Sequence, residues 1–183
     1  GSAIPNIRSA VRGRMRRMMV SATFPRTLEC TLLPVQEADL PALYAFQDDP
    51  VLRSLRVVPY RNREAFFAKW KAVLEDHEVV KQTIWADGQL AGSILCFHGE
   101  HGRELNILLG RAYWSKGIGS AALTQFLAQL AHLKGPLTAR VVEHNTASIR
   151  LLEKHHFSKT SDTPFTDAEG NSLFEFVLER PEP

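Results

Sequence analysis

The chain has 183 residues, a length that predicts one domain with room for a sizeable buried core. Its 44% hydrophobic and 23% charged residues are ordinary values for a globular protein and exclude a low-complexity chain. No apolar run approaches the roughly 18 residues of a membrane-spanning helix, so we expect no membrane partner. Cys30 and Cys96 both lie in apolar runs. We therefore expect buried thiols in a reducing, cytoplasmic setting, with neither a disulfide framework nor a metal site.

The net charge of +2 conceals an uneven distribution along the chain. Residues 1–26 contain six arginines and no acidic residue, whereas the remainder has 16 basic and 20 acidic residues. Gly1-Ser2 resembles a remnant of tag removal, and the basic stretch has the composition of a transit peptide, a nucleic-acid-binding arm or a disordered extension. We expect the disordered extension, because the stretch is poor in apolar residues, and we expect no nucleic-acid partner. Residues 27–183 are then predicted to form a single domain.

Apolar periodicity and turn residues predict the elements in chain order. Asp87-Gly88 is a hairpin-turn signal, Lys134-Gly135-Pro136 is a helix stop, and Pro50 disfavours helical backbone just before it. The expected elements are a strand at 28–35, helices at 39–51 and 62–76, strands at 79–86, 90–97 and 104–109, a helix at 118–133, a strand at 137–142, a helix at 145–155, and strands at 157–160 and 173–178, the last two flanking a turn-rich loop at 161–172. This order predicts an α+β fold, in which helices cover both faces of one mixed, mostly antiparallel sheet.

A glycine loop, Tyr113-Trp-Ser-Lys-Gly-Ile-Gly119, joins the predicted strand at 104–109 to the helix at 118–133. The first turn of a helix offers unpaired backbone N–H groups and the positive end of the helix dipole, so the junction is suited to an anion. Gly117 and Gly119 carry no Cβ and allow the backbone to approach a phosphate closely. A plain turn is the alternative to a site for a pyrophosphate-bearing ligand.

Three phosphate-binding loops compete for this segment. The nucleoside triphosphate loop has its lysine after the glycines, whereas Lys116 precedes them. The dinucleotide fingerprint is matched by Gly117, Gly119 and Ala122, with Glu143 near the position of its ribose-binding acid. That fingerprint follows its strand directly, however, and residues 111–116 intervene here. A dinucleotide-dependent oxidoreductase stays as an alternative.

The third design carries a resemblance to a known family. Residues 114–119 resemble the acyl-CoA loop of the GNAT N-acetyltransferase superfamily, Q/R-x-x-G-x-G/A, with Trp114 at the Q/R position. A second block, from Asn145 to Phe157, begins 26 residues after Gly119 and resembles the family pattern N-x-x-S/A-x-x-L-x-E-K-x-G-F, with His156 in place of its glycine. The run Tyr-Trp-Ser-Lys-Gly is most similar to the branch that acetylates ribosomal-protein N-termini on alanine or serine. The resemblance implies a GNAT acyl-CoA N-acyltransferase fold and acetyl-CoA as cosubstrate, without a metal.

The resemblance also implies which residues bind the cosubstrate. The strand before the loop would bind the pantetheine arm through its backbone, and the loop with the first helical turn would bind the phosphates. Asn145 is expected beside the pantetheine and is also a strong helix N-cap residue. The full set is Ile107, Leu108, Leu109, Trp114, Ser115, Lys116, Gly117, Ile118, Gly119, Ser120 and Asn145. Core packing of residues 107–109 and an exposed loop lysine are the structural alternatives.

Proton transfer is the least conventional part of the pattern. The tyrosine that many family members use as the thiolate acid is replaced by Leu152. In the N-terminal-acetylating branch a serine at the position of Ser148 is the candidate donor, and a role in the helix turn is the alternative. Glu104 stands where several members place a glutamate base, and a solvated strand-end glutamate is the alternative. His144 and Glu143 are weaker candidates.

The scarcity of candidate general bases in the sequence indicates which kind of amine the acceptor carries. A lysine amine, with a pKa of about 10.4, is almost fully protonated at pH 7, whereas an α-amine, with a pKa of about 7.7–8.0, is partly neutral there. We therefore predict an acetyl-CoA-dependent N-acetyltransferase acting on a primary amine of a small molecule or of a peptide or protein N-terminus. A CoA-binding GNAT-fold module without catalysis, serving as a sensor or partner-binding protein, is the alternative from another functional class. A monomer and a homodimer both stay open.

Overall fold

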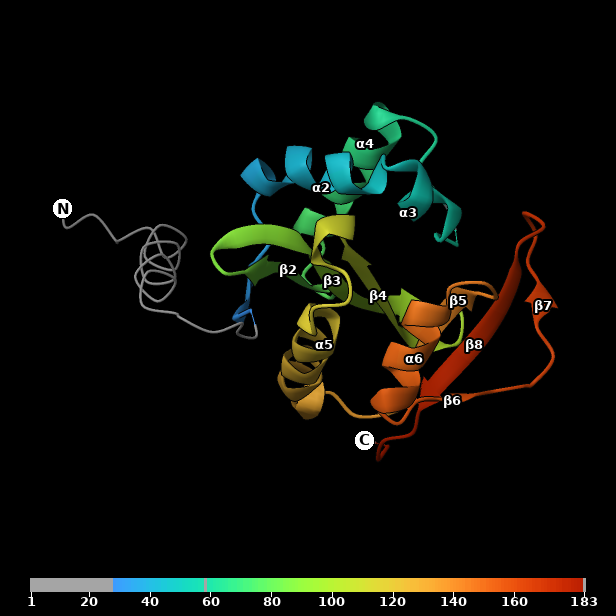
Figure 1. Ribbon diagram of the computed structural model, residues 1–183. Helices are drawn as coiled ribbons and strands as arrows, with labels where there is room; N and C mark the ends of the chain where they lie inside the picture. Colours follow the sequence, from blue (N-terminus) through green and yellow to red (C-terminus); the bar gives the residue numbers. More distant parts are fainter. Residues whose placement is uncertain (1–27, 58, 183) are drawn as a thin grey trace.

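The computed structural model describes residues 28–57 and 59–182, in which one sheet carries helices on both faces (Figure 1). The strands are β1 (Cys30–Pro34), β2 (Val80–Ala86), β3 (Gln89–Gly99), β4 (Gly102–Leu109), β5 (Leu137–Val142), β6 (Ser158–Lys159), β7 (Phe165–Thr166) and β8 (Ser172–Leu178). The α-helices are α2 (Leu40–Gln47), α3 (Pro50–Ser54), α4 (Arg63–Glu75), α5 (Ile118–Gln129) and α6 (Thr146–Lys154). Three 3-10 helices are η1 (Glu37–Asp39), η2 (Arg111–Tyr113) and η3 (Leu130–His132). The predictions for residues 1–26 lie outside the described residues.

The strand order is β1-β2-β3-β4-β5-β8-β6, and β7 pairs with β8. Within this sheet β4 and β5 are parallel, and each of the other described pairs is antiparallel. The β2–β3 hairpin turns at Asp87 and Gly88, whose φ angles of +47° and +79° are those of a two-residue type I′ turn. The parallel pair is joined through α5, as a crossover connection requires. The mixed, mostly antiparallel sheet predicted from the sequence is confirmed.

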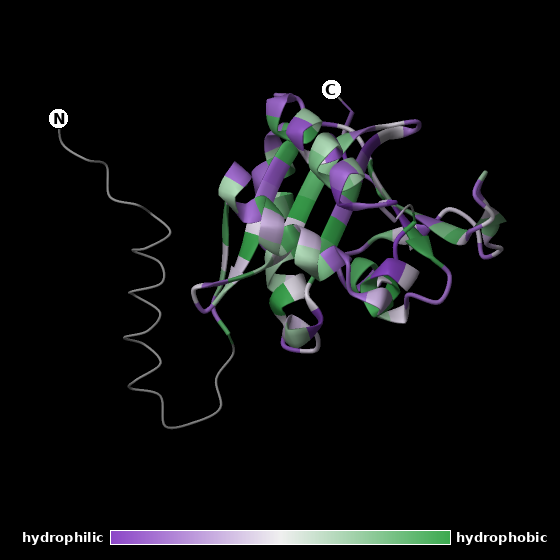
Figure 2. Cartoon of the chain, turned by 90° about the horizontal axis from the view of Figure 1, so that it is seen from above, coloured by the Kyte–Doolittle hydropathy of each residue, from purple (hydrophilic) through white to green (hydrophobic). Residues whose placement is uncertain are grey.

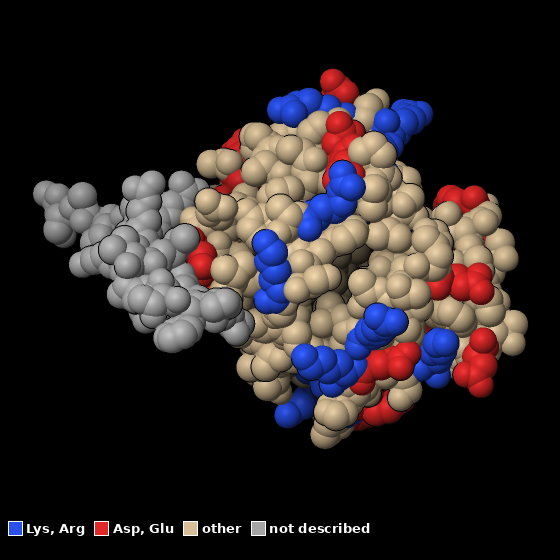
Figure 3. Space-filling model, in the orientation of Figure 1, with Lys and Arg blue, Asp and Glu red and all other residues tan. Residues whose placement is uncertain are grey.

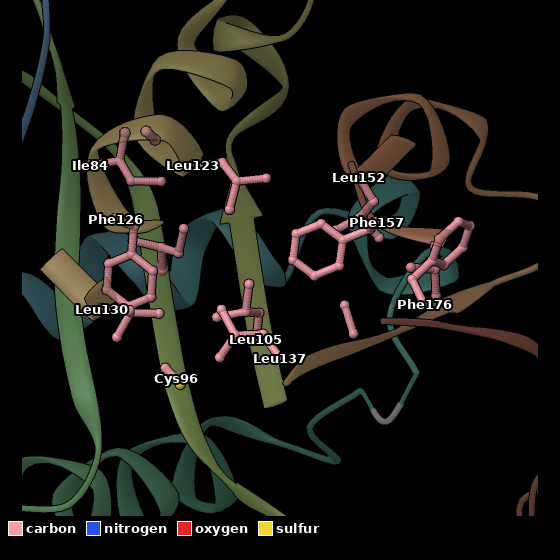
Figure 4. Close-up of a cluster of buried hydrophobic side chains, with 14 of the residues drawn as sticks. Ile84, Cys96, Leu105, Leu123, Phe126, Leu130, Leu137, Leu152, Phe157 and Phe176 are labelled. Atoms are coloured by element: carbon pink, nitrogen blue, oxygen red, sulfur yellow. The ribbon is translucent and has the colours of Figure 1, made fainter. Parts of the chain in front are cut away.

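Side-chain alternation along the strands separates two hydrophobic clusters. On β3, Ile94 and Cys96 belong to the first cluster with α5 and α6, whereas Leu95 packs against the second cluster with α2 and α4. Because neighbouring strand residues point to opposite faces, the two helix pairs cover opposite faces of the sheet. Figure 4 shows the first cluster, where Phe126 of α5 and Leu152 of α6 approach side chains from the central strands. Figure 2 shows green, hydrophobic bands along those strands and purple, hydrophilic bands on the helices and loops around them.

The structure corrects several predicted boundaries. The helix expected at 39–51 is two helices, because the Asp49 carboxylate accepts a hydrogen bond from the Val51 N–H and starts α3 afresh, with Pro50 in its first turn. The helix expected at 118–133 ends at Gln129 and continues as η3. The strand expected at 157–160 is only Ser158–Lys159. The loop expected at 161–172 contains β7, which pairs with β8. No helix in the described ranges combines the length and hydrophobicity needed to cross a membrane.

Candidate active site

The central strands β4 and β5 separate toward their carboxyl ends. They pair through Arg103 with Leu137 and through Glu104 with Thr138, after which β5 continues its ladder with β8 on its other side. A cavity of 470 Å³ lies at this separation, and its walls come from β4, β5, the glycine loop, α5, α6 and the segment around α3. The space-filling view shows a hollow on this side of the molecule, with Lys and Arg side chains around it (Figure 3).

The edge of β4 presents backbone groups to this gap. The Gly110 N–H donates to the Ala91 carbonyl over 2.8 Å, which extends the antiparallel β3–β4 ladder beyond the pair of Leu109 with Gly92. Backbone groups in such a ladder alternate in direction from one residue to the next. The N–H groups of Leu109 and Ile107 therefore point away from β3, toward the gap left by β5. Both side chains also pack against the first cluster, so packing and backbone exposure coexist at these residues.

The glycine loop provides further backbone donors. Gly117 is the N-cap of α5 with a φ of +79°, a left-handed conformation in which a Cβ would be strained, and Ser115 has a φ of +59°. The Ala121 N–H donates to the Gly117 carbonyl over 3.1 Å, so the N–H groups of residues 118–120 have no carbonyl one turn earlier within the helix. Residues 118–120 all line the cavity, which places these donors at its wall.

Two side chains shape the cavity wall through the backbone. The Trp114 indole N–H donates to the Leu109 carbonyl over 2.8 Å, which holds the glycine loop against the end of β4. The Asn145 side chain accepts a hydrogen bond from the Ser148 N–H over 3.2 Å and caps α6, so the predicted N-cap role is confirmed.

Most of the predicted cosubstrate residues share this one cavity. Lys116 is exposed in the loop and does not contribute to the lining, which agrees with its structural alternative. The predicted residues that do line the cavity are Ile107, Leu108, Leu109, Trp114, Ser115, Gly117, Ile118, Gly119, Ser120, Asn145 and Ser148. Segments from two separate sequence blocks are thus brought to a single site.

The two candidates for proton transfer lie in different surroundings. Ser148 is half-buried in the first turn of α6 and lines the cavity. Glu104 lies at the closed junction of β4 and β5, where its side chain is 15% exposed and its Oε1 is 3.3 Å from Nε of Arg140. Burial raises the pKa of Glu104, and the Arg140 guanidinium opposes that rise. Arg140 lines the cavity, whereas Glu104 does not. Leu152 is buried in the first cluster, so a hydrocarbon occupies the usual place of the tyrosine.

Sequence reasoning missed the contribution of the segment around α3. Leu52, Leu55, Arg56 and Val57 line the cavity, although no motif marks them. Long-range hydrogen bonds hold this segment in place: the Val57 carbonyl accepts from the Asn171 side chain over 2.8 Å. In the sequence, a run of apolar residues interrupted by arginines was the available signal.

The cysteines and the acidic residues give no sign of covalent or metal chemistry at the site. Cys30 and Cys96 are free thiols; Cys96 is buried as predicted, whereas Cys30 is only half-buried. Desolvation raises the pKa of Cys30 to about 11 and that of Cys96 above its usual value. A thiol with a raised pKa is a poor nucleophile at neutral pH. Among the described residues no group of three or more His, Cys, Asp or Glu side chains is arranged to hold a metal ion.

The sheet also bears on the dinucleotide alternative. A dinucleotide-binding unit lies in an open, mostly parallel sheet, and its ligand crosses the carboxyl ends of several parallel strands. The described sheet contains one parallel pair, β4 with β5. The match of Gly117, Gly119 and Ala122 to the dinucleotide fingerprint therefore lacks its structural context.

Known proteins share this architecture. A family model described as the acetyltransferase (GNAT) domain matches residues 29–158. The fold is similar to spermidine N-acetyltransferase from Vibrio cholerae, solved with CoA and spermine, at 13% identity and a TM-score of 0.69 over 82% of this chain and 95% of that one. It is also similar to the ribosomal-protein-S18-alanine N-acetyltransferase from Escherichia coli, at 18% identity and a TM-score of 0.63 over 85% of this chain and 96% of that one.

An aminoglycoside acetyltransferase solved with coenzyme A has 18% identity and a TM-score of 0.68, over 83% of this chain and 95% of that one. No curated protein sequence matches the chain. At these identities the solved structures support the GNAT fold and do not separate the ribosomal-protein branch from the others, whereas the family model spans well over half of the chain. The chain belongs to the GNAT acetyltransferase family, whose members are acetyl-CoA-dependent N-acetyltransferases.

Proposed function

We propose that this chain transfers the acetyl group of acetyl-CoA to a primary amine, and that a peptide or protein N-terminal α-amine is the acceptor. One observation carries the proposal: a single cavity joins the open backbone edge of β4 to the first turn of α5. A strand edge suits the amide groups of a pantetheine arm, and a helix N-terminus suits a pyrophosphate. CoA contains both groups, so the residues present fit this cosubstrate.

Each group of predicted residues has a task in this proposal. The N–H groups of residues 118–120 bind the phosphates, and Lys116 adds a positive charge at the outer rim. The N–H groups of Ile107 and Leu109 bind the pantetheine arm, and one of them polarises the thioester carbonyl, where negative charge develops during transfer. Asn145 fixes the start of α6 and thereby keeps Ser148 in the cavity wall.

The transfer forms a C–N bond while the C–S bond of the thioester breaks. The amine loses a proton and the departing thiolate gains one. We assign Ser148 as the donor to the thiolate, because it is the predicted acid that lines the cavity. We assign Glu104 as a base that reaches the amine through water, because its partner Arg140 lines the cavity and Glu104 itself does not.

The lining of the cavity favours an acceptor with a low amine pKa. None of the described residues that line it is an Asp, Glu or His. A lysine side chain, with a pKa of about 10.4, would lack a strong base in direct contact. An α-amine, with a pKa of about 7.7–8.0, needs less help to lose its proton. This is the physical support for a peptide N-terminus as acceptor.

Thiol release from acetyl-CoA, measured with peptides of different N-terminal residues, tests the proposal. We expect release with free N-termini and a mass increase of one acetyl group on the first residue. The matched control is the same peptide with a blocked N-terminus and an internal lysine, for which we expect no release. If only the internal lysine is acetylated, the acceptor is a side-chain amine and the proposed α-amine acceptor is wrong.

A CoA-binding module without catalysis is the second candidate, favoured by the buried Leu152 at the usual tyrosine position. Calorimetry with CoA and with NAD(P), beside the thiol-release assay, separates the alternatives. Binding of CoA without release for any amine would support the module. Tight NAD(P) binding without CoA binding would overturn both. The cytoplasmic location and the homodimer stay predictions.

A further inference from the structure

Arg56 enters the cavity from the face of the sheet opposite α5. Its guanidinium carbon lies 5.0 Å from the centroid of the Tyr60 ring, and Tyr60 packs with the second cluster, which includes α2 and α4. Nε2 of His144 lies 3.1 Å from the Ser54 carbonyl oxygen and so holds the end of α3 beside the turn that follows β5. The proposed phosphate donors of residues 118–120 belong to the other face. Arg56 therefore lies on the side from which an acceptor, and not the cosubstrate phosphates, would approach.

The charge of Arg56 has no carboxylate partner among the described residues. Its Nε is buried without a hydrogen-bond partner, although another part of the guanidinium donates a hydrogen bond to the Tyr60 phenol oxygen and Arg53 repels the charge. Burial lowers the pKa of this guanidinium, and the Tyr60 phenol opposes the decrease. By contrast, Arg53 pairs with Asp48 at 3.6 Å. Arg56 is a half-buried charge whose Nε is unpaired and that has no carboxylate counterion among the described residues. Such a charge is unfavourable for folding, so a ligand that supplies an anion would stabilise it.

Among the described residues, all charged side chains that line the cavity are positive. They are Arg56, Arg140, Arg150 and Lys154. Arg140 pairs with Glu104, and Arg150 and Lys154 lie on α6, whose Leu151 side chain is close to Gly119 of the glycine loop. Arg56 is thus the uncompensated cation on the acceptor side, and a polycationic acceptor would be repelled.

We infer that Arg56 selects the acceptor by binding a carboxylate on it, so that the substrate class is a primary amine bearing a carboxylate. This inference rests on the proposed acetyl transfer. A guanidinium binds a carboxylate through two parallel hydrogen bonds, and Nε with one terminal nitrogen forms one such edge. The carboxylate belongs either to an acidic residue near a peptide N-terminus or to a small amino acid. Both sources present the same chemistry to Arg56.

Matched acceptors test the inference and distinguish the two sources. The peptide series starts with Ala-Glu, Ala-Gln or Ala-Lys, is otherwise identical and has an amidated C-terminus; the small-molecule pair is alanine and alaninamide. We expect kcat/KM for the carboxylate member of one series to exceed that of its neutral counterpart by roughly 10- to 100-fold, as for other hydrogen bonds to charged groups. The Lys peptide and spermidine should be the poorest acceptors. Equal kcat/KM for the Glu and Gln peptides and for alanine and alaninamide would overturn the inference.

Three variants assign the discrimination to this side chain. Arg56→Met should abolish it, Arg56→Lys should keep part of it, and Arg56→Glu should favour the Lys peptide over the Glu peptide. Arg61→Met is the matched control, because Arg61 is an exposed arginine of the same segment and does not line the cavity, and it should leave the discrimination unchanged. Discrimination that survives in Arg56→Met would assign selection of the carboxylate to another group.

Two further readouts keep the inference separate from the proposed function. Calorimetry of the same acceptors with the protein–CoA complex measures the carboxylate preference without turnover. A preference in binding without thiol release would overturn the transferase alone, whereas release without a preference would overturn the role of Arg56 alone. CoA affinity should be unchanged in Arg56→Met, and its loss would assign Arg56 to the cosubstrate. The unfolding temperature of Arg56→Met should change little, because the variant loses the Tyr60 contact but also removes a half-buried charge without a carboxylate counterion; a fall of many degrees would make Arg56 structural.

Discussion

The indole N–H of Trp114 donates a hydrogen bond of 2.8 Å to the carbonyl oxygen of Leu109, the last residue of β4. This bond fastens the glycine loop to the strand edge, so the proposed phosphate and pantetheine sites keep a constant spacing. Trp114→Phe removes the donor while keeping an aromatic ring. A typical net hydrogen bond contributes about 0.5–1.5 kcal/mol, so we expect CoA to bind roughly 2- to 10-fold more weakly. Calorimetry measures this, and unchanged affinity would show that the loop is held by other contacts.

Gly119 tests the phosphate site with little disturbance of the fold. A Cβ at this position would lie 3.5 Å from Cδ2 of Leu151, an ordinary contact, and would project toward a residue that also lines the cavity. We therefore expect Gly119→Val to fold and to lose CoA binding, because the side chain occupies the approach of the phosphates. Ala128→Val, on the exposed side of α5, is the control and should bind normally. Normal binding by the Gly119 variant would place the phosphates elsewhere.

Ser148→Ala separates catalysis from positioning. An interaction formed only as the thiolate develops affects kcat, whereas CoA affinity should stay unchanged. General acid assistance is typically ~10²–10⁴-fold, and a serine, being a weak acid, should fall at or below the low end. Steady-state kinetics beside thermal unfolding measure the effect, with Thr146→Ala, an exposed residue of the same helix, as control. If stability and CoA affinity fall together at constant kcat, Ser148 serves the helix turn and not the proton.

Glu104 links turnover to pH. Because burial raises its pKa, the ionised base is lost at a higher pH than for an ordinary carboxylate. We expect kcat/KM of the unmodified protein to fall as the pH decreases through that raised value, and Glu104→Gln to be slower with this acidic limb removed. A pH–rate profile with a verified acceptor measures both. An identical acidic limb in the variant would exclude Glu104 as the base.

The same raised pKa makes a prediction for stability. The folded state binds the Glu104 proton more tightly than the unfolded state, so its contribution is fully present below the unfolded pKa of about 4.3 and is lost as the pH rises through the folded pKa. The free energy of unfolding of the unmodified protein, relative to Glu104→Gln, should therefore decrease over this window and then level off. Denaturant unfolding at several pH values measures it, and an increase over the same window would mean that the Arg140 pair lowers the pKa instead.

The amino-acid sequence alone determined the features that depend on neighbours along the chain. The periodicity of residues 63–75 produces α4, Asp87-Gly88 produces the hairpin turn, and Asn145 caps α6, because each rests on contacts within a few residues. The two motif blocks also identified most of the predicted residues that line the cavity. A glycine loop at a helix start forms an anion site from its own backbone N–H groups, so a local pattern is enough to find it. The split between α2 and α3 was signalled by Pro50, whereas β7 was missed because two residues show no periodicity and gain their order by pairing with β8.

Only the tertiary structure decided how these parts meet. β5 pairs with β4 only through Leu137 and Thr138, whereas it pairs with β8 along its whole length, from Leu137 to Val142. The gap beside β4 therefore depends on pairing between segments that are distant in sequence. The pairing of Glu104 with Arg140 and the entry of Arg56 into the cavity likewise depend on packing between distant segments. Charge and burial at a site come from such long-range contacts, which local sequence patterns do not encode, so the candidate acceptor side of this protein became visible only in the folded chain.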